Sequence, residues 1–474
     1  MGSVEVNHER PPAVDPQALD ALARWPAEKL TREELVQLAA SGEIEAVILA
    51  TPDIQGKLFG KSMPAELFLA EGSMEFSSGT LVYDNDWDML EGPNIGAANG
   101  WADMHMQTDW RSLRRLATFE KTAIVFADGA WASGESADEL PRRLLSRQLA
   151  RAAERGLGVV CAIETEFFVF AETYASARAK NFVNLDRLGE SASDYSILHI
   201  GLIDPLIAEI RRTCIDSGVP LESIKHEWGK AQLELTLTYS DAMEAADRIA
   251  LFKLITKQVC IKHGVAATFM ARYSEEEGSS SGHVHSSLWE LETGKSAMAD
   301  EQDPTRLGKT GRNWLGGMMA LAPDLMPFVC PSVNSFKRLD PETFAPTTNA
   351  WSLDVRTVPF RQVGRGPSLH VENRIPGADA NFYLALAAVV GAGLYGMDHE
   401  LEPIGEPITT AGFPGEKLPH TMPVALENLR SSKPAREIFG DAAVDHLVAM
   451  GENELAVYEK QVSDIERRRS FECA

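Results

Sequence analysis

Four segments of the chain alternate polar and apolar residues with a period of two, which is the pattern of a β-strand whose two faces meet different surroundings. Each segment carries polar side chains on one face and apolar side chains on the other. The predicted strands are Val159–Phe170, Ala231–Thr238, Gly282–Leu288 and Leu369–Ile375. In the same order, their polar faces carry Glu164 and Glu166, then Gln232, Glu234 and Thr236, then His283 and His285, then Glu372 and Arg374.

The first of these strands places carboxylates in an otherwise apolar sequence. Strands that alternate charged and apolar residues are most often half-solvated, and an isolated buried histidine is most often a core residue. The sequence VVCAIETEFFVF, however, is apolar enough for the centre of a sheet, where unpaired carboxylates are costly. A divalent cation supplies the missing counter-charge. Carboxylates with one imidazole favour Mg²⁺ or Mn²⁺ over a structural zinc ion.

Strand and turn signals fill the first part of the chain, and clear helix signals begin at Pro141. The region from about Thr31 to Phe126 contains short apolar strands between turns, and a small polar linker follows at residues 134–139. One helix is marked by a proline in its first turn and a glycine just after its end, and a second by a capping serine and a terminal glycine. A long apolar run predicts a third helix, which is buried. The predicted helices are Pro141–Arg155, Ser240–Gly264 and Phe382–Met397, and the predicted early strands are Ala46–Ala50 and Ala123–Phe126.

Length and charge narrow the class of protein. A chain of 474 residues exceeds a usual single core, so we predict two domains. Lys and Arg total 45 against 69 Asp and Glu, a net charge of −24. Such a surface repels phosphate backbones, so we predict no nucleic-acid partner. Any ATP must then be captured by local cations and metal ions.

The cysteines and the apolar runs bear on location. Five scattered cysteines without a CxxC pair suit reduced thiols in a cytoplasm. Residues 1–17 are polar and proline-rich, which predicts a flexible leader rather than a signal peptide. The longest apolar run is too short and too interrupted by glycine to span a bilayer. We therefore predict a cytoplasmic protein with no membrane partner.

Five motifs in order resemble those of the glutamine synthetase superfamily, and two departures given below make the chain resemble its γ-glutamyl amine ligase branch. Together they extend over about residues 30–400, and an ordered set is far more specific than one motif. The motifs are ETEFFVF within the first polar strand, HEWGKAQLEL at His226–Leu235, ATFMARYSEEEGSSSGHVHSSLW at Ala267–Trp289, NSFKRL at Asn334–Leu339 and ENRIPGADANFYLALAA at Glu372–Ala388.

The resemblance implies an α+β fold with two domains. An N-terminal β-grasp domain at residues 25–130 is expected to precede a catalytic domain at residues 138–474 built on a curved antiparallel sheet. In the family, the active site lies between the N-terminal domain of one subunit and the catalytic domain of the next. A ring-shaped homo-oligomer, a hexamer or dodecamer, is therefore expected.

The resemblance also assigns site residues. Two metal sites are implied, one with Glu166, Glu227 and Glu234 and the other with Glu164, His283 and Glu372. The implied ATP contacts are Glu222, Tyr239, His285, Ser287 and Arg361, with Tyr239 against adenine. The implied glutamate contacts are Arg338, Arg374, Gly278 and Ser279, and the implied catalytic arginines are Arg338, Arg356 and Arg361, with Arg356 near the transferring phosphate.

These assignments imply a ligase that uses ATP and two or more Mg²⁺ or Mn²⁺ ions. A carboxylate reacts with an amine only after its oxygen becomes a leaving group, so ATP is expected to phosphorylate the glutamate side chain. Phosphoryl transfer depends mainly on positioning and charge neutralisation, which metal ions and arginines supply. Attack of the amine on γ-glutamyl phosphate then releases phosphate and forms the amide.

Two departures from the family pattern concern the nitrogen substrate. Ammonia-using members hold ammonium between two acids, whose positions are here Ser77 and Phe344. An aromatic ring offers apolar and π contacts to a carbon-bearing amine, so we predict an organic amine, with polyamine, ethanolamine, alkylamine and arylamine as candidates. The predicted amine pocket comprises Ser77, Thr80, Asp84, Asp86, Trp87 and Phe344, with Asp84, Asp86 or Glu75 as a candidate base.

Other departures and alternatives remain open from the sequence. Gly278-Ser279 replaces the family's Asn-Gly, which weakens the inference of glutamate contacts there, and His370 replaces an arginine expected to contact nucleotide. The P-loop-like GKLFGKS at Gly56–Ser62 is one residue short and is interpreted as structural, and Arg467–Arg469 as a solvated helix face. The alternative functions are an ammonia-using glutamine synthetase, a non-catalytic member of the fold, and a phosphotransferase that forms no amide.

Overall fold

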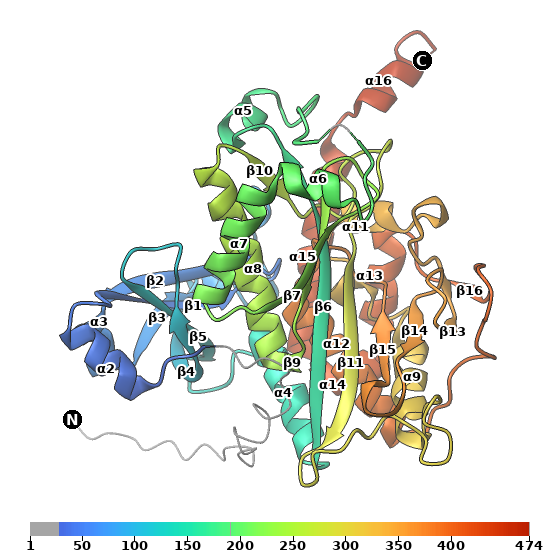
Figure 1. The fold of residues 1–474 in the computed structure, drawn as a ribbon, viewed down its shortest axis with the longest axis horizontal. Helices are drawn as coiled ribbons and strands as arrows, with labels where there is room; N and C mark the ends of the chain where they lie inside the picture. The colour runs from blue at the N-terminus through green and yellow to red at the C-terminus, as the bar shows by residue number, and fades with distance from the viewer. Residues whose placement is uncertain (1–27, 190, 474) are drawn as a thin grey trace.

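The structure is a computed structural model that describes residues 28–189 and 191–473, so the predicted leader at residues 1–17 lies outside the described residues (Figure 1). Helices and strands are both abundant, and the strands form two large sheets and one small one. The first sheet, drawn in blue at the left of Figure 1, has the order β2-β1-β5-β4-β3, with β1 and β5 parallel and the other pairs antiparallel. Its elements are α2 (Arg32–Ala40), β1 (Ala46–Pro52), β2 (Leu58–Pro64), α3 (Ala65–Glu71), β3 (Ser73–Ser77), β4 (Asp103–Arg115) and β5 (Thr122–Trp131).

The second sheet has the order β13-β14-β15-β11-β6-β8-β7, and β9 and β10 also pair with β6. Every neighbouring pair is antiparallel except β13 and β14. Its strands are β6 (Leu157–Phe170), β7 (Leu221–His226), β8 (Gln232–Leu237), β9 (Ser240–Asp241), β10 (Ala266–Thr268), β11 (Gly282–Glu290), β13 (Trp351–Leu353), β14 (Phe360–Val363) and β15 (His370–Asn373). The third sheet pairs β12 (Thr348–Asn349) with β16 (Glu416–Lys417).

Helices cover one face of the second sheet. Both α4 and α8 pack on β6, and α12 packs against α4, α8 and α9. These four helices are α4 (Pro141–Ala153), α8 (Ala242–Lys262), α9 (Lys309–Leu321) and α12 (Phe382–Asp398). The others are α5 (Tyr174–Ala179), α6 (Ile197–Leu202), α7 (Asp204–Asp216), α10 (Met326–Val329), α11 (Val333–Arg338), α13 (Met422–Ser431), α14 (Lys433–Phe439), α15 (Asp441–Lys460) and α16 (Asp464–Ser470).

The two faces of β6 differ as the period-two pattern predicts. Residues with odd numbers from Cys161 to Phe167 are buried beneath the helices, whereas Glu164 and Glu166 are half-buried on the other face. Helix α12 confirms the predicted buried helix, and it packs so closely on α9 that a Cβ on Gly396 would lie 2.1 Å from the Asn313 carbonyl oxygen. The sheet therefore has a packed face and an open face that carries the polar groups.

Several smaller predictions can be compared with the structure. The predicted cap of α8 is wrong by one residue: Ser240 lies in β9, and the Asp241 carboxylate accepts the capping hydrogen bond from the Glu244 backbone. Lys61 and Ser62 lie within β2 rather than at the start of a helix, which confirms that GKLFGKS is structural. The arginines of residues 467–469 are exposed on α16, which extends away from the rest of the chain (Figure 1). All five cysteines are free thiols, and among the described residues no helix is both long and apolar enough to cross a bilayer.

Buried ion pairs join the first sheet to the helices of the second. Arg142 on α4 is 1 % exposed and contacts Asp109 of β4 at 2.6 Å, Asp128 of β5 at 3.3 Å and Asp247 of α8 at 3.2 Å. Arg114 of β4 makes a bidentate pair with the buried carboxylate of Glu244, at 3.0 and 2.8 Å. Removal of one partner from a buried ion pair strongly destabilises the fold, because it leaves a buried charge without compensation. The two sheets are therefore held together by electrostatic pairs as well as by apolar packing.

Candidate active site

Three carboxylates converge on the open face of the second sheet. Glu166 of β6 lies directly opposite Glu234 of β8, and Glu227 follows the end of β7, where its backbone N–H bonds the Gln232 carbonyl at 2.9 Å. Their carboxylate oxygens all lie within 4.8 Å of one another. Burial, followed by repulsion from neighbouring carboxylates, raises the pKa of Glu234 to about 9. Such a cluster requires positive charge, and we call these three residues the acidic triad.

Lys225 supplies part of that charge. Its ammonium group bonds the Glu227 carboxylate, lies 3.7 Å from Glu234 and 3.3 Å from Asp194, and stands 4.4 Å from the centre of the Tyr195 ring. Burial opposes the charged form, but these carboxylates outweigh it and raise the pKa of Lys225. Sequence patterning does not single out this lysine, because it belongs to no period-two polar pair.

We expect the substitution Lys225→Met to tighten binding of Mn²⁺ by about tenfold, because an approaching cation no longer meets an ammonium group beside the triad. Isothermal titration of the purified protein with Mn²⁺ measures this change. The matched control is Lys230→Met, since Lys230 lies in the turn that follows β7 and makes no ion pair with the described residues. Unchanged or weaker binding in Lys225→Met would contradict the expectation.

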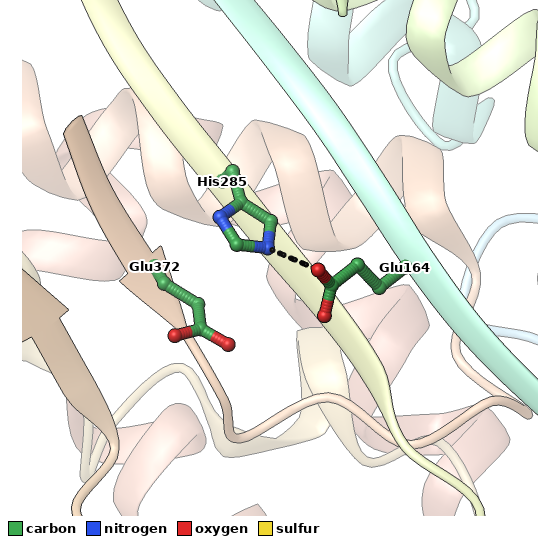
Figure 2. Close-up of side chains that lie close together, drawn as sticks. All are labelled: Glu164, His285 and Glu372. Atoms are coloured by element: carbon green, nitrogen blue, oxygen red, sulfur yellow. Dashed lines mark ion pairs between the residues drawn. The ribbon is translucent and has the colours of Figure 1, made fainter. Parts of the chain in front are cut away.

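A second group lies beside the triad and combines carboxylates with imidazoles. Glu164 of β6, His285 of β11 and Glu372 of β15 come from three adjacent strands and point toward one another (Figure 2). Nε2 of His285 is 3.4 Å from Glu164, and Nδ1 of His283 is 3.3 Å from Glu164 and 3.4 Å from Glu372. Both imidazoles therefore reach the carboxylates. The assignment of His283 to metal and His285 to ATP stays a prediction.

Both groups have the chemistry that a divalent cation requires. The triad offers only oxygen ligands, and the second group offers oxygens with an imidazole, as Mg²⁺ and Mn²⁺ prefer. The Nε2 atom of His283 is buried and has no hydrogen-bond partner among the described residues. An unpaired ring nitrogen beside carboxylates fits a ligand that is supplied from outside the chain.

Three buried arginines border these groups. Arg361 and Arg374 donate to the Glu372 carboxylate at 2.9 and 2.6 Å, and Arg338 donates to the carbonyl oxygens of Ile375 and Arg374 at 2.9 and 3.2 Å. Burial opposes ionisation of Glu372, but Arg374 and the histidines outweigh it and lower its pKa well below the usual range. The Nε–H groups of all three arginines have no acceptor among the described residues. Buried N–H groups without an acceptor fit an anionic ligand that is supplied from outside the chain.

A loop that contains Gly278 and Ser279 is fastened to the triad through Gln232. The Gln232 amide donates to Glu166 at 3.2 Å and to the Ser279 carbonyl at 3.0 Å, and the Ser281 backbone N–H donates to Glu166 at 2.7 Å. The Ser279 hydroxyl reaches Thr343 at 3.1 Å. Gly278 and Ser279, two of the four predicted glutamate contacts, therefore belong to a loop that borders the carboxylates.

The remaining predicted nucleotide and phosphate contacts are more dispersed. Ser287 is buried on β11 and accepts a hydrogen bond from the Trp289 indole at 3.0 Å. Glu222 and Tyr239 are exposed, at the start of β7 and after β8, and Arg356 is exposed in the turn between β13 and β14. His370 Nε2, at the arginine position of the family pattern, lies 3.1 Å from Nδ1 of His285. The structure gathers the metal candidates but leaves Arg356 outside both groups.

The predicted amine pocket is divided within one chain. Thr80 donates to the Ser77 carbonyl at 2.8 Å, and the Asp84 carboxylate accepts from the backbone N–H groups of Asp86 and Asp88, both at 2.8 Å. Trp87 is exposed, and its ring lies 4.5 Å from the Lys57 ammonium group. No hydrogen bond, ion pair or ring contact among the described residues joins this loop to Phe344, which instead packs on Trp228. Sequence patterning does not single out Trp228, although it follows Glu227 directly.

Comparisons with known proteins give the family. Residues 138–470 match the glutamine synthetase catalytic domain. The chain is 37 % identical to gamma-glutamylethanolamide synthetase of Streptomyces coelicolor over 96 % of its length and 98 % of that protein, and 34 % identical to glutamate–isopropylamine ligase of a Pseudomonas species over 86 % and 90 %. A solved structure of GmaS without ligand superposes with a TM-score of 0.81 and 26 % identity, over 93 % of this chain and 99 % of that one. With its mixed helices and sheets, this chain belongs to the glutamine synthetase family.

Proposed function

We propose that the chain is an ATP-dependent carbon–nitrogen ligase that joins the side-chain carboxylate of L-glutamate to an organic amine. The observation that carries the proposal is the pair of carboxylate-rich groups on one sheet face, bordered by arginines with unpaired Nε–H groups. Three relatives of similar sequence support it. Two are the gamma-glutamylethanolamide synthetase and the glutamate–isopropylamine ligase named above, and the third is a gamma-glutamylanilide synthase of an Acinetobacter species, at 28 % identity.

Each group has a role in this proposal. The acidic triad holds one divalent cation, and Glu164 and Glu372 with His283 hold another; Glu222, Tyr239, His285, Ser287 and Arg361 bind ATP. When bound, the Mg²⁺ or Mn²⁺ ions neutralise charge on the phosphates. Arg338 and Arg374, with the Gly278–Ser279 loop, bind glutamate. Their positions support this role because these groups border the carboxylates.

The reaction proceeds in two displacements. The glutamate carboxylate oxygen attacks the γ-phosphorus of ATP, so γ-glutamyl phosphate forms and ADP leaves. The amine nitrogen then attacks the acyl carbon of the γ-carboxyl group (Cδ), the bond to phosphate oxygen breaks, phosphate leaves, and the nitrogen loses a proton. Arg361, buried against Glu372, and Arg356 stabilise charge on the transferring group by our proposal. Ser77, Thr80, Asp84, Asp86, Trp87 and Phe344 surround the amine.

The architecture forms part of the proposal. We infer a β-grasp domain at residues 25–130, followed by a catalytic domain at residues 138–474, and the parallel pairing of β1 with β5 supports the first of these. Because one chain separates Phe344 from the loop of Ser77 to Trp87, a second copy in a ring-shaped homo-oligomer completes the pocket. A cytoplasmic location agrees with the free thiols.

A panel of amines tests the proposal. Purified protein is incubated with ATP, glutamate and Mg²⁺ or Mn²⁺, together with ammonium, ethanolamine, an alkylamine, aniline or a polyamine. We expect equal amounts of ADP and γ-glutamyl amide, measured by coupled assay and mass spectrometry, with an organic amine preferred to ammonium. Highest activity with ammonium would identify a glutamine synthetase instead. ADP release with glutamate alone, without amide, would identify a phosphotransferase.

A further inference from the structure

Two exposed aromatic side chains lie together beside the acidic triad. Trp228 is 61 % exposed and Phe344 is 50 % exposed, yet their ring centroids are only 6.0 Å apart and their planes are tilted by 49°. They come from segments that are distant in sequence, the turn between β7 and β8 and the turn after α11. Aromatic rings at this separation attract each other and present a continuous apolar surface. We call Trp228 and Phe344 the aromatic pair.

Short chains of contacts fix both members relative to the triad. The Trp228 backbone N–H donates to the Glu227 carboxylate at 3.0 Å. On the other side, Thr343, which precedes Phe344, bonds the Ser279 hydroxyl at 3.1 Å. The Ser279 carbonyl then accepts from the Gln232 amide, which also contacts Glu166 at 3.2 Å. The aromatic pair therefore stands at the border of the triad.

The backbone at Phe344 points to the same role. Its φ of +57° lies in the left-handed region, which a bulky aromatic residue seldom adopts. A glycine at this position would remove that strain at once. Residues held in such conformations gather at ligand sites, where the side chain has to take one direction. At Phe344 this conformation occurs beside the acidic triad and places the ring against Trp228.

We propose that the aromatic pair binds the hydrocarbon part of the amine substrate, so that the enzyme prefers primary alkylamines of several carbons to ammonium or methylamine. The proposal rests on the proposed ligase function and narrows its substrate class. The two rings bind the alkyl chain through apolar burial, which is lost when either ring is removed. Trp228 and Phe344 thereby determine amine specificity.

The test is a series of unbranched primary amines from methylamine to pentylamine. In the wild-type protein we expect kcat/KM to rise about two- to fourfold per added methylene, as burial of each against apolar surface predicts. In Trp228→Ala and in Phe344→Gly, we expect the rise to disappear. The KM for pentylamine should increase by about tenfold or more, and by a larger factor than the KM for methylamine. Trp228→Phe should restore part of the rise.

A matched control separates ring loss from relief of backbone strain. Phe182 is 53 % exposed and has the same φ of +57°, but it lies in a loop after α5, so Phe182→Gly should retain the wild-type series. The inference would be overturned if kcat/KM fell by the same factor for all amines in both test variants. It would also be overturned if kcat/KM still rose with chain length in both. Neither result would affect the ligase function. Failure of the wild-type protein to form amide from any amine would overturn the proposed function and this inference with it.

Discussion

Replacement of Glu164 by alanine is expected to lower ATP turnover by about a thousandfold or more, equivalent to about 4 kcal/mol of lost transition-state stabilisation. Glu164 lies in contact distance of both His283 and His285, and it faces Glu372 across the second group (Figure 2). The histidines outweigh the effect of burial and hold the pKa of Glu164 far below its usual range. Alanine removes the carboxylate that both imidazoles contact and that the second group offers to a metal ion.

The measurement is ADP release with glutamate and amine at saturating Mg²⁺ or Mn²⁺. A suitable control is Glu290→Ala, because Glu290 lies on β11 at the opposite end of its ladder with β6 and is exposed. We expect the control to retain nearly full turnover and both variants to retain the same circular dichroism. Turnover near the wild-type level in Glu164→Ala would remove the basis for the metal assignment.

Arg142→Met should reduce the free energy of unfolding by about 3–5 kcal/mol, because it leaves buried carboxylates without a counter-charge. The Arg142 guanidinium contacts three aspartates, and Asp247, the most deeply buried of them, also accepts a hydrogen bond from the Tyr383 hydroxyl at 2.7 Å. Burial opposes ionisation of Asp109, but Arg142 outweighs it and holds its pKa below the ordinary value. Urea unfolding followed by fluorescence measures the change.

The adjacent residue on α4 provides the control for this variant. Arg143 is about one third exposed and pairs only loosely with Asp138, at 4.0 Å, so Arg143→Met should cost no more than about 1 kcal/mol. A similar loss of unfolding free energy in both variants would show that the loss comes from replacing any arginine on α4 and not from the buried ion pairs. A loss below about 1 kcal/mol in Arg142→Met would show that the buried ion network contributes little.

Period-two alternation predicts the strands of the site because each residue's face follows directly from its position in a strand. The alternation is therefore enough to identify Glu164, Glu166 and Glu234 as members of polar faces, and β6 shows the predicted difference between its faces. The order of strands cannot be derived in this way. It depends on pairings such as Glu372 opposite His285, between segments far apart in the chain.

Residues in turns are inaccessible to the same reasoning. Trp228 follows Glu227, where β7 gives way to a turn that contains Ala231 with a φ of +57°. No periodicity extends through such a turn, so the Trp228 side chain cannot be assigned a direction from the sequence. Lys225 lies on β7 opposite Glu234 of β8, and the pairing of these two strands cannot be read from the sequence alone. The resemblance to a family supplies Glu227 but says nothing of Lys225 or Trp228. The separation of Phe344 from Trp87 likewise depends on how the chain folds as a whole.

The buried ion pairs between the first sheet and helices α4 and α8 also restrict how the molecule can close over its substrates. A hinge rotation between the two sheets would separate Arg114 and Arg142 from their carboxylates and leave those charges exposed or without a partner. Rearrangement of a surface loop separates no such pair. Closure is therefore expected to come from the segments around Ser279 and Phe344, which reach the open face without contributing to that network.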